Sequence, residues 1–192
     1  INDTFGHTEG DLALTHFVRI LIETFRDSDV IGRMGGDEFV ILLESLDSPQ
    51  RPIDIVHRIR NTLIQPFTID NADIYLTTSI GVLIGTQEYT SPEEILRDAD
   101  IAMYHAKNLG RDTFEIFNAG MREQIMNRVD LERDLRQAIQ NEEFFLEYQP
   151  ITHLNTSRLR GFEALIRCHH PSRGLIFPAE FIPIAEQTGL II

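Results

Sequence analysis

The stretch GRMGGDEFVILL, residues 32–43, constrains the fold of this chain more than any other stretch. Apolar residues precede and follow its glycines, so residues 30–34 and 39–43 are predicted to form the two strands of a hairpin. Gly35 and Gly36 stand where the hairpin needs a tight turn, and glycine adopts left-handed backbone angles there without steric cost. Because glycine has no side chain, the same turn leaves room for the phosphates of a ligand.

Two carboxylates, Asp37 and Glu38, follow the glycines directly. Two acids that share a site repel each other unless a cation lies between them, and oxygen-only ligands favour Mg²⁺, with Mn²⁺ as the alternative. Taken alone, an acidic glycine turn is more often a solvated turn than a metal site. Both interpretations therefore stay open until the other motifs are considered.

Composition and charge exclude several classes of function. The chain has 192 residues, a net charge of −13 and one cysteine, Cys168. A chain this acidic repels a polyphosphate backbone, which argues against nucleic acid as a partner.

A single cysteine permits no internal disulfide and fits a cytoplasmic location. The apolar runs are far too short to span a membrane, so we expect no membrane contact from this segment. Since the chain begins with Ile1, we interpret it as an internal fragment, whose parent protein could carry an anchor elsewhere.

Apolar spacing, capping residues and turn residues predict that helices and strand pairs alternate over residues 1–117. Beside the hairpin, the expected elements are helices at 10–26, 53–63 and 92–107 and strands at 67–70, 74–84 and 113–117. Helices that cover an antiparallel-rich sheet are typical of an α+β fold. Residues 119–140 are predicted as a charged helix that leads into a new unit, with strands at 144–151 and 159–167.

Two further pairs of polar residues bear on the choice between turn and site. Asn2 and Asp11 offer an amide and a carboxylate that together could read a base, although both could simply cap a helix. Lys107 and Arg111 flank a helix end and a glycine. This pair suits phosphate charge; the alternative is ordinary basic capping of a helix C-terminus.

The chain resembles the GGDEF-type diguanylate cyclases. The family's motif order appears as 1-INDTFGHTEGD-11, 26-RDSD-29, 33-RMGGDEF-39, 79-SIG-81 and 99-ADIAMYHAKNLGR-111. Five ordered blocks with compatible spacing cover nearly all of residues 1–117, which makes the resemblance specific. It implies a ferredoxin- or palm-like nucleotidyl cyclase domain at 1–117, followed by a linker helix at 118–131.

The resemblance also implies a role for each matched residue. Asn2 and Asp11 would bind guanine, Gly35 and Gly36 would admit the phosphates, and Lys107 and Arg111 would hold the terminal phosphates. Asp37 and Glu38 would bind Mg²⁺, and Glu38 would help to activate the 3′-hydroxyl. The family's reaction joins two GTP molecules into cyclic di-GMP with release of pyrophosphate. Since each domain holds one GTP, the reaction implies a homodimer of two facing domains.

Arg26 and Asp29 match the family's product-inhibition site, whereas the alternative for so short a motif is an arginine and an aspartate on the surface. One departure concerns the first strand of the family, which carries another metal-binding aspartate ahead of the first block. The chain begins at Ile1, so we expect that strand and that ligand to be missing and the fragment itself to be inactive as a cyclase.

Residues 132–192 resemble the start of an EAL-type cyclic di-GMP phosphodiesterase domain, a TIM-like barrel, through 148-YQPI-151 and 161-GFEALIR-167. The resemblance implies that Glu163 is a metal ligand and that Gln149 and Arg167 contact the substrate. Cys168 stands where the family usually has tryptophan. We expect this opening portion of a barrel to be poorly packed and without phosphodiesterase activity. Its apolar positions are expected to lack partners: Phe144, Phe145, Leu165, Ile166, Phe181 and Ile184.

Two functions remain open from the sequence. The first is cyclic di-GMP signalling, with synthesis of cyclic di-GMP by the GGDEF domain of the parent protein and an EAL domain that would hydrolyse or bind the product. The second is a catalytically silent module that binds GTP or cyclic di-GMP and controls the adjacent EAL domain.

Overall fold

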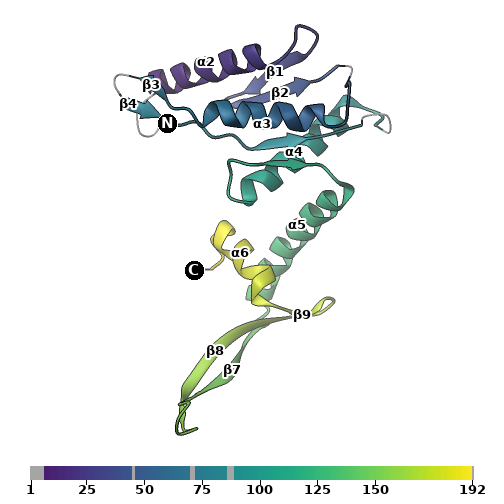
Figure 1. Ribbon diagram of the computed structural model, residues 1–192. Helices are drawn as coiled ribbons and strands as arrows, with labels where there is room; N and C mark the ends of the chain where they lie inside the picture. The colour runs from purple at the N-terminus through teal and green to yellow at the C-terminus, as the bar shows by residue number, and fades with distance from the viewer. Residues whose placement is uncertain (1–6, 45, 70–71, 86–88, 192) are drawn as a thin grey trace. The chain divides into compact units, whose positions relative to one another are not determined.

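The computed structural model describes residues 7–44, 46–69, 72–85 and 89–191. The chain divides into two compact units, Ile1–Met121 and Arg122–Ile192, and both combine helices with strands (Figure 1). The first unit contains α2 (His7–Thr24), β1 (Val30–Gly35), β2 (Glu38–Leu42), α3 (Arg51–Leu63), β3 (Phe67–Ile69), β4 (Ala72–Ile74), β5 (Ile80–Val82), α4 (Pro92–Asn108) and β6 (Phe114–Ile116). The α+β class predicted from the sequence is confirmed.

The helices α2 and α3 form the core of the first unit together with the β1–β2 hairpin. Ile20 and Leu21 of α2 pack against a stripe on α3, and the apolar side chains of the hairpin cover both. The stripe on α3 consists of Ile55, Ile59 and Leu63, which recur at four-residue spacing and so lie on one face of the helix. Figure 1 shows the two helices running side by side.

The helix α4 begins as its sequence predicts. The Ser91 hydroxyl accepts a hydrogen bond from the Glu94 main-chain N–H at 3.3 Å, Pro92 occupies the first turn, and Glu93 and Glu94 place negative charge at the positive end of the helix dipole. Such a cap satisfies a main-chain donor that the helix leaves unpaired.

One predicted strand is wrong. Residues 74–84 were expected to form a single strand paired with 67–70, but β4 ends at Ile74 and β5 begins only at Ile80. β4 pairs with β3 in antiparallel fashion, whereas β5 pairs in parallel with β6, on the far side of α4 in sequence. Local alternation cannot reveal a parallel partner that arrives after a helical crossover.

The crossover explains the glycine of the SIG motif. A Cβ atom on Gly81 of β5 would collide with the carbonyl oxygen of Ala99 and the amide nitrogen of Met103, both on α4. Helix α4 therefore lies directly on the backbone of β5, and Ala102 beside it is wholly buried.

The second unit contains α5 (Ala119–Gln140), whose first three residues belong to the first unit, and β7 (Phe144–Thr152), β8 (Leu159–His170), β9 (Gly174–Ile176) and α6 (Pro178–Thr188). Strands β7, β8 and β9 form one antiparallel sheet. The expectation of poor packing is wrong for Phe181 and Ile184, which are buried, and for Phe144 and Ile166, which pack against them. Helices α5 and α6 supply the partners: Leu135 of α5 is 1% exposed.

Cys168 lies in the same core and is fully buried. Burial, and then the negative charge of Glu143, raise the pKa of its thiol. The protonated thiol behaves as a small apolar group, so Cys168 serves packing here.

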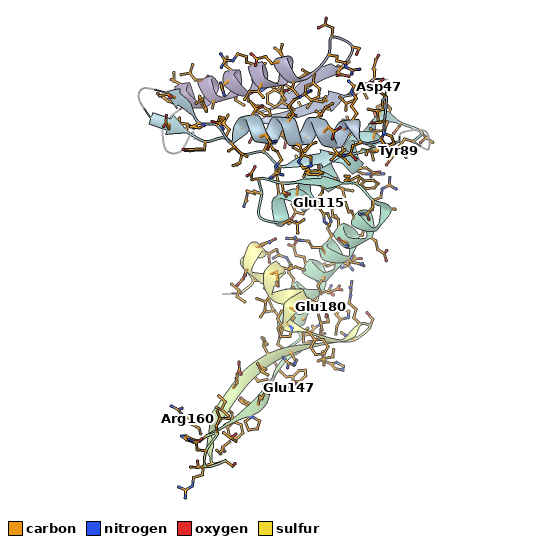
Figure 2. The ribbon with its side chains drawn as sticks, viewed as in Figure 1. Asp47, Tyr89, Glu115, Glu147, Arg160 and Glu180 are labelled. Atoms are coloured by element: carbon orange, nitrogen blue, oxygen red, sulfur yellow. The ribbon has the colours of Figure 1, made fainter. Side chains whose placement is uncertain are left out.

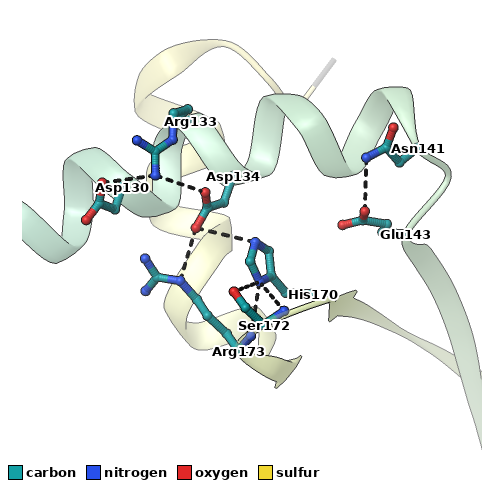
Figure 3. Close-up of polar contacts among 8 residues, drawn as sticks. All are labelled: Asp130, Arg133, Asp134, Asn141, Glu143, His170, Ser172 and Arg173. Carbon is teal, nitrogen blue, oxygen red and sulfur yellow. Dashed lines mark hydrogen bonds and ion pairs between the residues drawn. The ribbon is translucent and has the colours of Figure 1, made fainter.

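A polar cluster ties α5 to the turn between β8 and β9 (Figure 3). The buried Asp134 carboxylate accepts from Arg173 Nε at 3.0 Å and lies 3.4 Å from His170 Nε2. His170 Nδ1 accepts from the main-chain N–H groups of Ser172 and Arg173. Because Nδ1 is an acceptor, these partners assign the ring proton to Nε2, toward Asp134.

We expect Gly81→Ala to lower the free energy of unfolding by about 2 kcal/mol, because two main-chain atoms of α4 would have to move. Urea unfolding of the intact protein measures the change. Gly32→Ala is the matched control, since a Cβ there would meet Val40 O at 3.8 Å, an ordinary contact. Equal stability of the two variants would contradict the close approach of α4 to β5.

Candidate functional site

The glycine turn joins β1 and β2 through Gly36 and Asp37. Gly35 pairs with Glu38, which leaves a two-residue loop between the strands. Gly36 has a φ of 51°, whereas Gly35, at 159°, lies close to extended backbone. A left-handed first loop residue is typical of a hairpin turn that favours glycine at this position. Within the described part of the chain, leaving aside each glycine and its chain neighbours, no atom lies within 4 Å of the place where a Cβ on either glycine would stand. The backbone here is therefore open to a ligand.

Two contacts hold the turn in place. Arg33 of β1 donates from Nε and Nη2 to the Gly36 carbonyl oxygen, at 3.0 and 2.6 Å. Its guanidinium also lies over the ring of Phe39, 5.9 Å from the centroid. Phe39 in turn meets Phe17 of α2 edge to face, with centroids 5.3 Å apart. The turn is therefore fixed to the core of the first unit.

The carboxylates of Asp37 and Glu38 are exposed at this turn. Among the residues that the structure describes, no three His, Cys, Asp or Glu side chains gather as a metal site. Two adjacent, exposed carboxylates nevertheless fit Mg²⁺, which is commonly bound through one or two carboxylates, with water and substrate phosphates completing the shell.

The other residues predicted for the substrate lie on separate elements. Asn2 is outside the described residues, and Asp11 is exposed on α2. Lys107 is exposed in the last turn of α4, and Arg111 is exposed in the loop that follows. The structure thus places each described residue at the surface of the first unit, where a ligand has access.

Arg26 and Asp29 lie in the turn between α2 and β1, but their side chains have different partners. The Asp29 carboxylate is wholly buried and pairs with Arg51 of α3 at 3.1 Å. It also accepts from the Arg26 main-chain N–H at 3.0 Å. The Arg26 guanidinium is exposed and pairs with Asp47 at 3.1 Å (Asp47 is labelled in Figure 2). In this conformation Arg26 faces solvent, whereas Asp29 fixes the turn.

A small pocket of about 150 Å³ opens beside this turn, lined by Thr24, Arg26, Arg51, Asp54, Ile55 and Arg58. Three of these side chains are guanidinium groups. Arg58 donates to the Thr24 carbonyl oxygen, which leaves its positive charge without a carboxylate partner in that bond. Such a pocket suits an anion, since guanidinium groups bind phosphate oxygens well.

Sequence reasoning missed Arg51 and Arg58. Both lie on α3 seven residues apart, a spacing that places two side chains on one face of a helix. This signal was present, but only the packing of α3 beside α2 shows that the face meets Arg26.

In the second unit, the β7–β8 hairpin gathers the residues predicted for the EAL portion. Gln149 is paired directly with Glu163. Alternation along β8 puts Glu163 and Arg167 on the same face. An open pocket with a volume of about 620 Å³ is lined by Glu147, Tyr148, Gln149, Pro150, Leu165 and Arg167. Arg167 Nε donates to the Glu147 carboxylate at 2.8 Å (Glu147 is labelled in Figure 2). The Arg167 guanidinium is therefore already paired with a carboxylate of the same hairpin.

Two protein families match the chain. Residues 1–113 match the family described as "Diguanylate cyclase, GGDEF domain", and residues 132–192 match the EAL domain. Among solved structures, a variant of PA1120 (TpbB or YfiN) from Pseudomonas aeruginosa that comprises only the GGDEF domain is similar, with 30% identity and a TM-score of 0.63. The similarity covers 66% of this chain and 74% of that chain.

Curated relatives match the whole chain. The bifunctional diguanylate cyclase/cyclic di-GMP phosphodiesterase MucR of Pseudomonas aeruginosa is 36% identical over 192 residues, which are 100% of this chain and 28% of MucR. The cyclic di-GMP phosphodiesterase NbdA of the same organism is 32% identical over 191 residues, 24% of its length. The chain thus spans about a quarter of the length of these relatives. Every helix in the described part of the chain is too short or too polar to cross a bilayer.

The two ion pairs of the Arg26–Asp29 turn are expected to differ in how much they contribute to stability. Arg51→Ala leaves the buried Asp29 carboxylate without its counter-ion, so we expect the free energy of unfolding to fall by about 3 kcal/mol. Arg26→Ala removes an ion pair whose side chains are 62% and 68% exposed, and such pairs contribute at most about 1 kcal/mol. Urea unfolding of both variants of the intact protein compares them, and an equal loss would show that Asp29 does not depend on Arg51.

Proposed function

The chain belongs to the GGDEF family of diguanylate cyclases and continues into the start of an EAL domain, and from this we propose that the intact protein makes cyclic di-GMP from two molecules of GTP. The observation that carries the proposal is the β1–β2 turn. It combines a left-handed Gly36, open backbone at both glycines and the exposed carboxylates of Asp37 and Glu38. We assign the cyclase domain to 1–117, the linker helix to 118–131 and the EAL portion to 132–192.

In the proposed reaction, the 3′-oxygen of one GTP attacks the α-phosphorus of the other, and the bond to pyrophosphate breaks. The reciprocal step closes the ring, so two GTP yield one cyclic di-GMP and two pyrophosphates. Because each domain holds one GTP, the site is complete only when two copies face each other as a homodimer. GTP as the substrate implies a cytoplasmic location for this domain.

In this proposal the residues of the glycine turn have two kinds of role, substrate binding and chemistry. Gly35 and Gly36 admit the phosphates, and the Glu38 carboxylate attracts the proton of the attacking 3′-hydroxyl. Asp37 and Glu38 would hold Mg²⁺, which stabilises the negative charge that develops on the phosphates.

Four residues would hold the ends of the substrate in this proposal. Asn2 and Asp11 hydrogen-bond to guanine. Lys107 and Arg111 bind the terminal phosphates. Orienting the two reactants in this way supplies much of the acceleration expected of such a site.

A regulatory function without turnover is the second candidate, and one observation favours it. NbdA is similar over the whole of this chain, yet it is described only as a phosphodiesterase. In that case the first unit would bind GTP or cyclic di-GMP and control an EAL domain that hydrolyses or binds the product. GTP binding without product formation in the intact protein would select this function over synthesis.

The EAL portion carries a separate proposal. Gln149 and Arg167 would contact cyclic di-GMP and Glu163 would bind a metal ion, since the hairpin brings all three to one face of its sheet. The ion pair between Arg167 and Glu147 would have to open for Arg167 to reach a phosphate.

Replacement of Glu38 tests the cyclase function. Glu38→Gln keeps the shape of the side chain but removes the charge that binds metal and attracts a proton, so we expect turnover to fall by about 100-fold or more. Chromatography of cyclic di-GMP formed by the intact protein from GTP and Mg²⁺ measures the rate. Glu23→Gln, on an exposed position of α2, is the control for loss of charge. Normal turnover of Glu38→Gln would rule out this assignment.

The pocket lined by Arg26 and Arg58 supports the proposal that Arg26 belongs to a product-binding site that restrains the cyclase. The buried Asp29 would contribute by holding Arg51, which lines the same pocket. Arg26→Ala removes one guanidinium from the pocket and should weaken cyclic di-GMP binding about tenfold or more, as expected for one charge-assisted hydrogen bond. Calorimetry on the intact protein measures the affinity. Asp47→Asn removes the carboxylate that competes for Arg26, so it should leave the affinity equal or higher. Unchanged binding by Arg26→Ala would leave Arg26 as a surface arginine and Asp29 as a structural residue of the turn.

A further inference from the structure

The loop that follows α4 has an unusual backbone. Gly110, Arg111 and Asp112 are three consecutive residues with positive φ, at 110°, 63° and 44°. Residues with a side chain rarely adopt this region, because the Cβ atom approaches the main-chain oxygen. Two such residues in succession persist only where the surroundings hold them.

Arg60 of α3 supplies that support from outside the loop. Its Nη2 donates to the Asp112 carbonyl oxygen at 2.6 Å, across 52 positions of sequence. Its Nε lies 3.9 Å from Asp112 Oδ1. This Nε is buried and has no hydrogen-bond acceptor within the described residues. A small movement would let it donate a hydrogen bond to the Asp112 carboxylate.

The position of Arg60 is itself fixed. Its neighbour Ile59 and the last helical residue, Leu63, are buried in the core of the first unit. The His57 ring meets Phe114 edge to face, with centroids 5.3 Å apart. Phe114 begins β6, two residues after Asp112. Helix α3 therefore holds both the loop and the strand that follows it.

We propose that Arg60 is a positioning residue for the phosphate end of the nucleotide site. By holding Asp112 in its left-handed conformation, Arg60 fixes the backbone of Arg111 and hence the direction of the Arg111 side chain relative to Lys107. This inference rests on the proposed function, in which Lys107 and Arg111 bind the terminal phosphates of GTP. Arg60 itself acts through the loop and touches no substrate.

The proposal predicts different effects on the binding of two ligands that share guanosine but differ in the number of phosphates. The probes are a GTP analogue with a methylene bridge between the α- and β-phosphorus, and GMP. We expect Arg60→Ala to weaken binding of the analogue about tenfold, which corresponds to one misplaced charge-assisted hydrogen bond, and to leave GMP binding unchanged. Calorimetry on the intact protein with Mg²⁺ measures both affinities.

A second substitution tests the mechanism through the backbone. Glycine adopts a positive φ without help, so Asp112→Gly in the Arg60→Ala background should restore most of the affinity for the analogue. Arg60→Lys keeps the charge and loses the planar fork of donors, so it should show a smaller loss in the same direction; it also serves if Arg60→Ala does not fold. Arg19→Ala is the matched control, since Arg19 is exposed on α2 and bonds to His16 of the same helix.

Three outcomes would overturn the proposal. Equal weakening of GMP and the analogue would mean that Arg60 supports the fold in general. Wild-type affinity in both Arg60 variants would mean that the loop does not need the arginine, and failure of Asp112→Gly to restore binding would exclude the backbone mechanism. If the unsubstituted protein binds neither nucleotide, the proposed function fails as well; if it binds both and the variants match it, only the role of Arg60 fails.

Discussion

The side chains of Leu21, Ile55 and Ile59 pack α2 and α3 side by side against the β1–β2 hairpin. Three parts of the first unit that bear on the proposed sites depend on this contact. It seats Phe39, and with it the glycine turn; it brings Arg51 to the Asp29 carboxylate; and it fixes the helix from which Arg60 reaches the loop after α4. A buried apolar core tolerates few rearrangements, so polar groups at three places are held in defined positions by one cluster of apolar side chains.

The sequence predicts those features whose cause is local. The hairpin follows from apolar runs on both sides of two glycines, and α4 follows from Ser91, Pro92 and two acids in its first turn. The class of the fold is equally local in origin, because it needs only the alternation of helical and strand periods. The residues of the glycine turn could be named in advance for the same reason, since a tight turn and its side chains are neighbours in sequence.

The features that the sequence does not predict depend on distant partners. The parallel pairing of β5 with β6 needs the crossover through α4, which no period-two pattern encodes. In the sequence Asp29 is an ordinary loop aspartate, and only the fold shows that it pairs with Arg51 of α3. In the same way, Phe181 and Ile184 have no partner nearby in sequence, and in the fold α5 packs against them. The left-handed backbone at Arg111 and Asp112 has no sequence signal beyond the preceding glycine, because its support comes from Arg60, 52 positions away.

The way the arginines are bonded explains how an acidic chain can attract a phosphate ligand. With a net charge of −13, the average field of the protein repels a triphosphate. Arg51 pairs with a buried carboxylate, and the two charges largely cancel at a distance. Arg33 and Arg58 instead donate to carbonyl oxygens, at the glycine turn and at the pocket beside Arg26. A carbonyl orients a guanidinium without neutralising it, so positive charge remains at the glycine turn and at the pocket beside Arg26, two of the places where phosphates are proposed to bind. The bond of Arg33 or Arg58 to a carbonyl therefore leaves the positive charge of its guanidinium uncompensated, whereas the Asp29 carboxylate largely cancels the charge of Arg51.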